Sequence, residues 1–193
     1  MAKLNPTFSD TLKDKISFVR RNPYIQLIIS EKNWYFGKYF LKKYNDEEYI
    51  RLLYRKAFGK DLNLDDPQTF NEKLQWLKLN YRDPDMALCA DKFEVRKYLT
   101  NKGFGDILNT LYAVYENADD IEFSKLPSQF VLKASHGSGW NIICKNKSDY
   151  SWKGWTKVMN SWLKQNLYVY GREWVYKDIK SRILCEKYLE IDD

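Results

Sequence analysis

A small polar loop rich in glycine lies between two short apolar segments in the second half of the chain. The loop is Ser135-His136-Gly137-Ser138-Gly139, and the apolar segments are residues 130–133 and 141–144. Glycine reaches backbone angles that other residues avoid, so the main-chain N–H groups of such a loop can surround an anion such as phosphate. These residue types at this spacing therefore indicate a phosphate-binding loop.

Lys133 provides the positive charge that such a loop needs. Both apolar segments are rich in β-favouring residues and bounded by turn residues, which predicts a two-stranded hairpin. Side chains alternate between the two faces of a strand, so Phe130 and Leu132 point one way, and Lys133 points the other way, beside the loop. An ordinary hairpin with a Gly-Ser turn has the same pattern, and the loop matches neither standard glycine-rich phosphate motif.

His136 is the single histidine of the chain. A histidine in a loop suggests a general base, but no serine or cysteine nucleophile accompanies it in a fitting motif. Support of the loop, or a hydrogen bond to phosphate, is the better interpretation.

Two further patterns have competing interpretations. Asp83-Pro84-Asp85 has the D-x-D spacing of a glycosyltransferase metal site, and a helix-breaking turn explains it equally well. Trp152, Trp155 and Trp162 suggest stacking platforms for sugars or single-stranded nucleic acid. Because Trp155 and Trp162 are seven residues apart, they share one face of a helix, which favours packing in the core.

The composition is that of a folded protein with an excess of basic residues. The 193 residues are 44% hydrophobic, which is enough for a core, and 32 Lys and Arg against 26 Asp and Glu give a net charge of +6. This charge favours anionic partners, although the charges are interspersed and most belong to a solvated surface.

Three isolated cysteines argue for reduced thiols in the cytoplasm and against a disulfide framework or zinc site: Cys89, Cys144 and Cys185. Neither a secretion signal nor a membrane-spanning segment is expected.

Hydrophobic periodicity predicts the elements that must position these residues. Helices are predicted at residues 9–21, 47–58, 71–81, 91–101 and 152–167, and further strands at residues 111–115 and 182–189. Pro23 and residues 82–85 are predicted to end helices, and residues 168–180 show no clear pattern. The basic amphipathic helix at 9–21 could lie on an acidic membrane surface or pack against the protein. A helical first half followed by strands alternating with helices indicates an α+β or mixed α/β fold.

Several separated strings, in order along the chain, resemble the TupA-like ATP-grasp family. They are Thr69-Phe70-Asn71-Glu72-Lys73-Leu74-Gln75-Trp76-Leu77, Asp91-Lys92, Leu126-Pro127, Phe130-Val131-Leu132-Lys133, His136-Gly137-Ser138-Gly139, Tyr170-Gly171-Arg172-Glu173-Trp174 and Glu186-Lys187-Tyr188-Leu189. The resemblance covers residue 69 to the end, with a looser match from residue 35. It implies a helical N-terminal region at 1–68, N-terminal and central ATP-grasp subdomains with the glycine loop at 69–180, and a hinge strand at 181–193. The implied ATP-grasp fold is incomplete and contains a small antiparallel sheet flanked by helices.

The resemblance also implies a bound ATP and a role for most of the matching residues. Lys92 and Lys133 would contact the phosphates, and the loop at 136–139 would fold over them. Glu186, with main-chain groups of Lys187 and Leu189, would bind the adenine edge, and a structural ion pair is the alternative for its carboxylate. Asp192 or Asp193 would hold the ribose, whereas the string from Tyr170 to Trp174 suggests no chemistry. The implied nucleotide-binding residues are Lys92, Lys133, His136, Gly137, Ser138, Gly139, Glu186, Lys187, Tyr188, Leu189 and Asp193.

The reaction implied by the family is the ATP-dependent joining of a carboxylate to an amine through an acylphosphate. Its setting is bacterial surface or capsular polysaccharide assembly, where such proteins are often labelled glycosyltransferases. Mg²⁺ is expected in the family, with its ligands in a catalytic subdomain beyond the hinge, so an ATP-grasp fold that ends at Asp193 is incomplete and is expected to have little activity alone.

The expected partners are therefore ATP and a carboxylate-bearing sugar or amino acid, in the cytoplasm, and nucleic acid is not expected. Contact with the inner face of the membrane or with a biosynthetic complex is a further option. Two alternatives to the ligase remain: a glycosyltransferase of polysaccharide biosynthesis, and a non-catalytic module that binds nucleotides or other anions.

Overall fold

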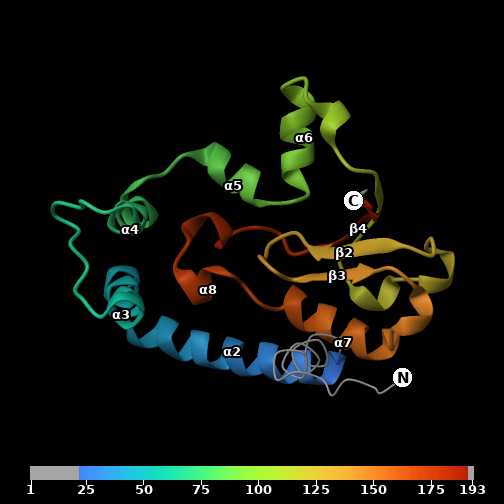
Figure 1. The fold of residues 1–193 in the computed structure, drawn as a ribbon, viewed down its shortest axis with the longest axis horizontal. Helices are drawn as coiled ribbons and strands as arrows, with labels where there is room; N and C mark the ends of the chain where they lie inside the picture. The colour runs from blue at the N-terminus through green and yellow to red at the C-terminus, as the bar shows by residue number, and fades with distance from the viewer. Residues whose placement is uncertain (1–21, 191–193) are drawn as a thin grey trace, which may run out of the picture.

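The computed structural model describes residues 22–190, and Figure 1 shows their arrangement. Within this range the chain forms seven α-helices and one four-stranded antiparallel sheet. Helices pack against the sheet, and a further group of helices lies beside it. The fold is α+β, as predicted, with a small antiparallel sheet flanked by helices.

The sheet brings together strands that are far apart in the sequence. They are β1 (Leu111–Tyr115), β2 (Phe130–Ala134), β3 (Asn141–Cys144) and β4 (Ile183–Lys187), in the spatial order β1-β4-β2-β3. The last strand, β4, therefore pairs antiparallel with both β1 and β2. In this register Val131 lies opposite Glu186 and Lys133 lies opposite Leu184. The predicted hairpin of β2 and β3 is confirmed.

One face of the sheet packs on helix α7 (Trp152–Leu163) and forms the main core. Its side chains come from alternate positions of the strands, as expected when one face of an antiparallel sheet is buried. They include Phe130, Leu132, Ala134, Ile142, Cys144, Ile183 and Cys185, in one cluster with Trp155, Val158, Met159 and Trp162 of α7. Trp155 and Trp162 therefore belong to the core, and α7 ends four residues earlier than predicted.

Helix α2 (Pro23–Lys43) was not predicted from the sequence, and Pro23 is its first residue. Proline has no N–H to lose in the first helical turn, so here it begins the helix. The side chain of Asn22 caps this end by accepting hydrogen bonds from the N–H groups of Tyr24 (3.0 Å) and Ile25 (3.2 Å). The predicted helix at 9–21 lies outside the described residues. Within residues 22–190, α2 included, no helix is both long and apolar enough to cross a membrane.

Helix α2 packs along α7, on the side of α7 that is turned away from the sheet (Figure 1). The two helices approach closely at a glycine, because a Cβ added to Gly154 would lie 2.6 Å from Cγ of Pro23. The order of layers is therefore α2, α7 and then the sheet. Since α2 packs on α7 across the predicted boundary at residue 68, the division into separate regions stays a prediction.

The next two helices lie where the sequence predicts them. They are α3 (Asp46–Phe58) and α4 (Phe70–Asn80), and each begins with a capping box. In α4, the N–H of Glu72 donates to Oγ1 of Thr69 at 3.3 Å, and the Glu72 carboxylate accepts from the Thr69 N–H at 2.8 Å. These reciprocal bonds satisfy two N–H groups that a helix start leaves free.

The break predicted at residues 82–85 is confirmed, because α4 ends at Asn80 and residues 81–83 are not helical. A short helix that was not predicted, α5 (Pro84–Ala90), begins within this segment. The Asp83 carboxylate caps it by accepting a hydrogen bond from the Asp85 N–H at 2.9 Å. The D-x-D string therefore has a structural role as a helix start. The following helix, α6 (Glu94–Asn101), begins three residues later than predicted, because residues 91–93 form a turn.

Arg172 gives the string from Tyr170 to Trp174 a structural role. It follows α8 (Tyr168–Gly171), and its side chain is 1% exposed. Its Nε lies 3.3 Å from Oδ1 of Asp46, its Nη1 donates to the Val169 carbonyl at 2.7 Å, and its guanidinium stacks 4.2 Å from the Tyr49 ring centroid. The arginine therefore joins α8 to the start of α3, which holds the N-terminal helices against the rest of the molecule.

Candidate functional site

Two lysines from separate elements converge at the glycine loop. Lys133 lies on β2, on the face of the sheet opposite α7, and Lys92 lies in the turn before α6. The ammonium of Lys92 donates a hydrogen bond to the main-chain carbonyl of Gly137, inside the loop. Burial, and then the nearby charge of Lys133, lower the pKa of Lys92 below its ordinary value. The site therefore holds two cations close enough to repel each other.

A buried ion pair holds Lys92 in this place. The preceding residue, Asp91, is 3% exposed, and its Oδ2 lies 3.3 Å from Nη1 of Arg182, directly before β4. The other oxygen of Asp91 accepts a hydrogen bond from the Phe93 N–H at 2.8 Å. The main-chain N–H of Lys92 in turn donates to the Ser135 carbonyl at 3.2 Å. The turn before α6 is thus tied both to the sheet and to the base of the glycine loop.

The glycine loop has an anchored base and an exposed tip. Ser135, His136 and Gly137 are buried, whereas Ser138 and Gly139 are exposed. At the base, Oγ of Ser135 donates to the Lys180 carbonyl at 3.0 Å and accepts from the Arg182 N–H at 3.1 Å. The tip is exposed, with the Gly139 carbonyl accepting a hydrogen bond from the Asn141 N–H at 3.1 Å, and an exposed tip on an anchored base suits a loop that folds over a ligand.

Glycine is required at two positions of the loop for different reasons. A Cβ at Gly137 would lie 2.2 Å from Cε3 of Trp140, so the indole ring occupies the space of a side chain. Gly139 has a φ of +74°, in the left-handed region that other residues rarely adopt. The conformation of the loop thus depends on both residues.

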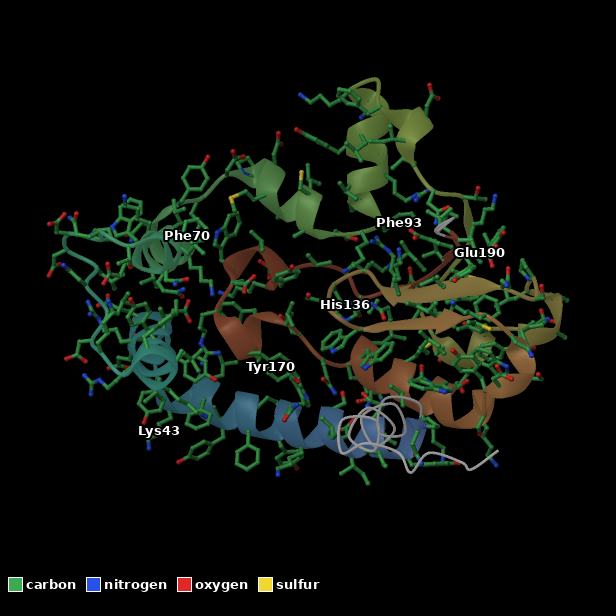
Figure 2. All side chains as sticks on the ribbon, viewed as in Figure 1. Lys43, Phe70, Phe93, His136, Tyr170 and Glu190 are labelled. Atoms are coloured by element: carbon green, nitrogen blue, oxygen red, sulfur yellow. The ribbon has the colours of Figure 1, made fainter. Side chains whose placement is uncertain are left out.

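His136 points away from the two lysines and into the protein. Its side chain is 2% exposed, and Nε2 lies 2.8 Å from the Trp162 carbonyl of α7 (Figure 2 labels His136). Burial lowers its pKa below the ordinary value of 6.5, and the hydrogen bond to Trp162 opposes this shift only in part. The ring therefore supports the loop, and any phosphate contact at this position falls to the main chain.

Glu186 forms a buried ion-pair cluster across the sheet. Its carboxyl oxygens lie 2.7 Å from Nζ of Lys133 and 3.5 Å from Nη1 of Arg96, and the residue is 6% exposed. The ion pair expected as the alternative role of Glu186 is therefore present. Sequence analysis did not identify Arg96, and no local pattern connects a helix arginine to a strand 90 positions later.

Both main-chain polar groups of Lys187 already form hydrogen bonds. Its N–H donates to the Thr110 carbonyl at 2.9 Å, and its carbonyl accepts from Nδ2 of Asn109 at 2.8 Å. A hydrogen bond from the Lys187 N–H to adenine would have to replace its bond to Thr110, and a second bond to its carbonyl would share the oxygen with Asn109. Tyr188 and Leu189 follow the strand, and Leu189 is 61% exposed, whereas Asp193 lies outside the described residues.

Three cavities of about 1020, 520 and 570 Å³ are formed by described residues, and Lys92, Lys133 and Glu186 line none of these three. The 1020 Å³ cavity lies behind the loop, where Gly139 and Trp140 line it together with residues of α2 and α7. Among residues 22–190, no group of three or more His, Cys, Asp or Glu side chains is placed to hold a metal ion.

Comparison with known proteins identifies the family. The family model described as TupA-like ATPgrasp matches residues 72–192, which include Lys92, Lys133, the glycine loop and Glu186. No curated protein and no solved structure matches the chain. Because the family model covers more than half of the sequence and agrees with the α+β fold, the chain belongs to the TupA-like ATP-grasp family.

Proposed function

We propose that this protein binds the phosphates of ATP between Lys92, Lys133 and the glycine loop, as the ATP-binding portion of a ligase that uses ATP to join a carboxylate to an amine. The observation that carries the proposal is the convergence of two lysines, from different elements, at one loop whose glycines cannot be replaced without a clash or strain. Membership of an ATP-grasp family supports the same ligand.

The electrostatics of the site favour an anionic ligand. Two ammonium groups held near each other repel, and burial of Lys92 adds to the cost of its charge. A phosphate between them would relieve both effects and would gain charge-assisted hydrogen bonds. The chemistry of the donors therefore fits the triphosphate of ATP.

Each of the two lysines already has one partner, and its ammonium retains further N–H donors for phosphate. In the structure Lys92 donates to the Gly137 carbonyl, and Lys133 pairs with Glu186. These contacts hold both side chains in place before the ligand arrives, which lowers the entropy cost of binding. The ammonium groups would then donate hydrogen bonds to phosphate oxygens, and the exposed tip at Ser138 and Gly139 would close over the ligand.

In the proposed reaction, a carboxylate oxygen attacks the γ-phosphorus of ATP, the bond to the β-phosphate oxygen breaks, and ADP leaves. The amine nitrogen then attacks the acyl carbon, loses a proton and displaces phosphate. Lys92 and Lys133 would orient the phosphates and neutralise their charge. We assign the adenine edge to the main chain of Tyr188 and Leu189, because the main chain of Lys187 is already bonded.

We place the reaction in the assembly of bacterial surface or capsular polysaccharides, with a uronic acid or an amino acid as the acceptor. This part of the proposal is supported by the family alone. The glycosyltransferase alternative loses its sequence support, because Asp83 of the D-x-D string caps α5.

Calorimetric titration of the full chain with ATP, ADP and AMP tests the proposal. We expect ATP to bind more tightly than AMP, and Lys92→Met and Lys133→Met each to weaken ATP binding by about tenfold or more, as expected for a lost charge-assisted hydrogen bond. Lys97→Met, an exposed lysine on α6, is the matched control and should bind like the wild type. Equal affinity for ATP and AMP, or tighter binding of a UDP-sugar, would overturn the proposal.

A further inference from the structure

The outer face of α2, turned away from α7, carries large apolar side chains and lysines. Its apolar members are Ile28 (68% exposed), Tyr35 (73%), Phe36 (56%) and Tyr39 (57%). With Lys32 and Lys43, these residues recur mostly at intervals of three or four and so form one stripe along the helix, which we call the α2 outer face. Figure 2 shows side chains along this edge of the molecule, with Lys43 labelled at its end.

This stripe is not used for packing within the described part of the chain. The inward face of α2, which includes Leu27 and the buried Gly37, meets the core cluster and α8. A depression of about 570 Å³ runs along the outer face and is lined by Tyr35, Phe36 and Tyr39 among others. Contiguous exposed apolar surface of this kind marks an interaction site.

The two lysines of the α2 outer face, Lys32 and Lys43, lie over aromatic rings and form no ion pair with a carboxylate within residues 22–190. Nζ of Lys32 lies 5.9 Å from the Phe36 ring centroid, and Nζ of Lys43 lies 5.9 Å from that of Tyr39. The one acidic residue of α2, Glu31, accepts a hydrogen bond from the Ser161 hydroxyl of α7. The α2 outer face is therefore both apolar and cationic.

The net charge of the whole chain is concentrated at this end of the sequence. Residues 1–43 contain nine Lys or Arg and three Asp or Glu, which accounts for the entire net charge of +6. The remaining residues, 44–193, are neutral overall. The excess positive charge of the chain thus belongs to α2 and the segment before it, and is separate from the local pair of lysines at the candidate nucleotide site.

We propose that the α2 outer face rests on an anionic phospholipid surface, with its rings among the headgroups and its lysines at the lipid phosphates. Aromatic rings with one polar edge, and lysines with long apolar stems, are the side chains that suit this interface. A helix binds in the plane of the bilayer through the apolar area that it buries there and through the attraction of its lysines to anionic lipid.

The layers of the fold make this attachment compatible with the candidate site. The sheet lies beyond α7 when viewed from α2, and Lys133 and Glu186 lie on the far face of the sheet (Figure 1). A bilayer under α2 therefore leaves the glycine loop and the two lysines open to water. The attachment does not depend on the identity of the nucleotide or the reaction.

Sedimentation of the full chain with vesicles tests the proposal. We expect binding to vesicles of equal parts phosphatidylglycerol and phosphatidylcholine, little binding to phosphatidylcholine alone, and a decrease with salt. Lys32→Gln with Lys43→Gln should weaken binding by about fivefold per lysine, and Tyr35→Ser/Phe36→Ser/Tyr39→Ser should abolish it. The controls are Phe104→Ser with Ile107→Ser, which are equally exposed elsewhere (57% and 72%), and Lys97→Gln with Lys102→Gln.

Three results would overturn the proposal. The first is equal binding to both kinds of vesicle. The second is unchanged binding by the triple variant, which would show that residues 1–21 or another surface make the contact with lipid. The third is a dimer in solution that the triple variant dissociates, without vesicle binding, which would make a second copy of the chain the occupant. Because the substituted side chains are exposed, thermal unfolding should be unchanged, and this measurement separates lost binding from lost folding.

Discussion

Nζ of Lys133 lies 2.7 Å from Oε2 of Glu186, across the neighbouring strands β2 and β4. The Glu186 side chain is 8% exposed and also pairs with Arg96, so its removal leaves two cations partly buried without their partner. We expect Glu186→Gln to lower the free energy of unfolding by about 2 kcal/mol, measured by urea denaturation.

The ion pair of Glu122 with Lys125 is a matched control for this prediction. Its N···O distance of 2.8 Å is nearly the same, but its side chains are 64% and 74% exposed. An exposed pair gains little because water screens it, so Glu122→Gln should change the free energy of unfolding by less than about 0.5 kcal/mol. Similar losses in the two variants would show that the Glu186 cluster does not stabilise the sheet.

The lowered pKa of Lys92 predicts how ATP binding depends on pH. Phosphate binds the ammonium form, so affinity should fall as pH rises through the pKa of Lys92, below the ordinary 10.5. ATP binding should also raise this pKa, because phosphate stabilises the charge. Calorimetry at alkaline pH, in buffers of different ionisation enthalpy, should therefore show proton uptake on binding.

Two variants identify the titrating group. Because the charge of Lys133 contributes to the lowered pKa of Lys92, Lys133→Met should move the fall in affinity to higher pH. In Lys92→Arg the charge persists at every pH used, so the alkaline fall and the proton uptake should both disappear. A wild-type affinity that stays constant up to about pH 10 would contradict the assignment to Lys92.

The two loop glycines should respond differently to alanine. Gly139→Ala is strained by its positive φ but meets no atom within 4 Å, so we expect a loss of about 1 kcal/mol in the free energy of unfolding. Gly137→Ala would collide with Trp140, which stacks on Trp162 at 6.3 Å, so a loss of about 2 kcal/mol or more is expected.

Gly59 provides the control for backbone strain. It ends α3 with a φ of +68° and also has open space around it, so Gly59→Ala should cost about as much stability as Gly139→Ala. Calorimetry should then show weaker ATP binding for Gly139→Ala alone, since Gly59 lies far from the loop in the sequence and in a different element. Equal effects of the two variants on ATP binding would remove the loop from the site.

The lowered pKa of His136 predicts that the protein loses stability at acid pH. Its pKa is below 6.5 in the folded state because the ring is buried, whereas the unfolded chain protonates near 6.5. This contribution to stability is therefore complete above pH 6.5 and decreases as pH falls from 6.5 to the folded pKa. In His136→Gln, whose amide can still donate to the Trp162 carbonyl, urea denaturation should show a smaller loss between pH 7 and pH 5. An identical pH dependence in both proteins would show that the ring is not held neutral.

Local patterns in the sequence predicted much of the fold. The alternation of β2 placed Lys133 on the face opposite the core, and hydrophobic periodicity placed α4 within one residue of each of its ends. Such signals work because side-chain direction repeats with the period of the strand or helix and depends only on nearby residues. Pro23 shows the limit of a local rule, because the same residue can end one helix or begin the next.

The loop, Lys92 and Lys133 were predicted from the sequence with the family resemblance, but their partners were not. The sequence by itself determined which face of β2 carries a positive charge. Only the tertiary structure decided that Lys133 meets Glu186, that Arg96 joins them, and that His136 turns inward. The physical reason is that β4 inserts between β1 and β2, and α7 packs beneath the loop. Contacts made across 26 to 90 residues depend on the packing of whole elements, which no nearby spacing records.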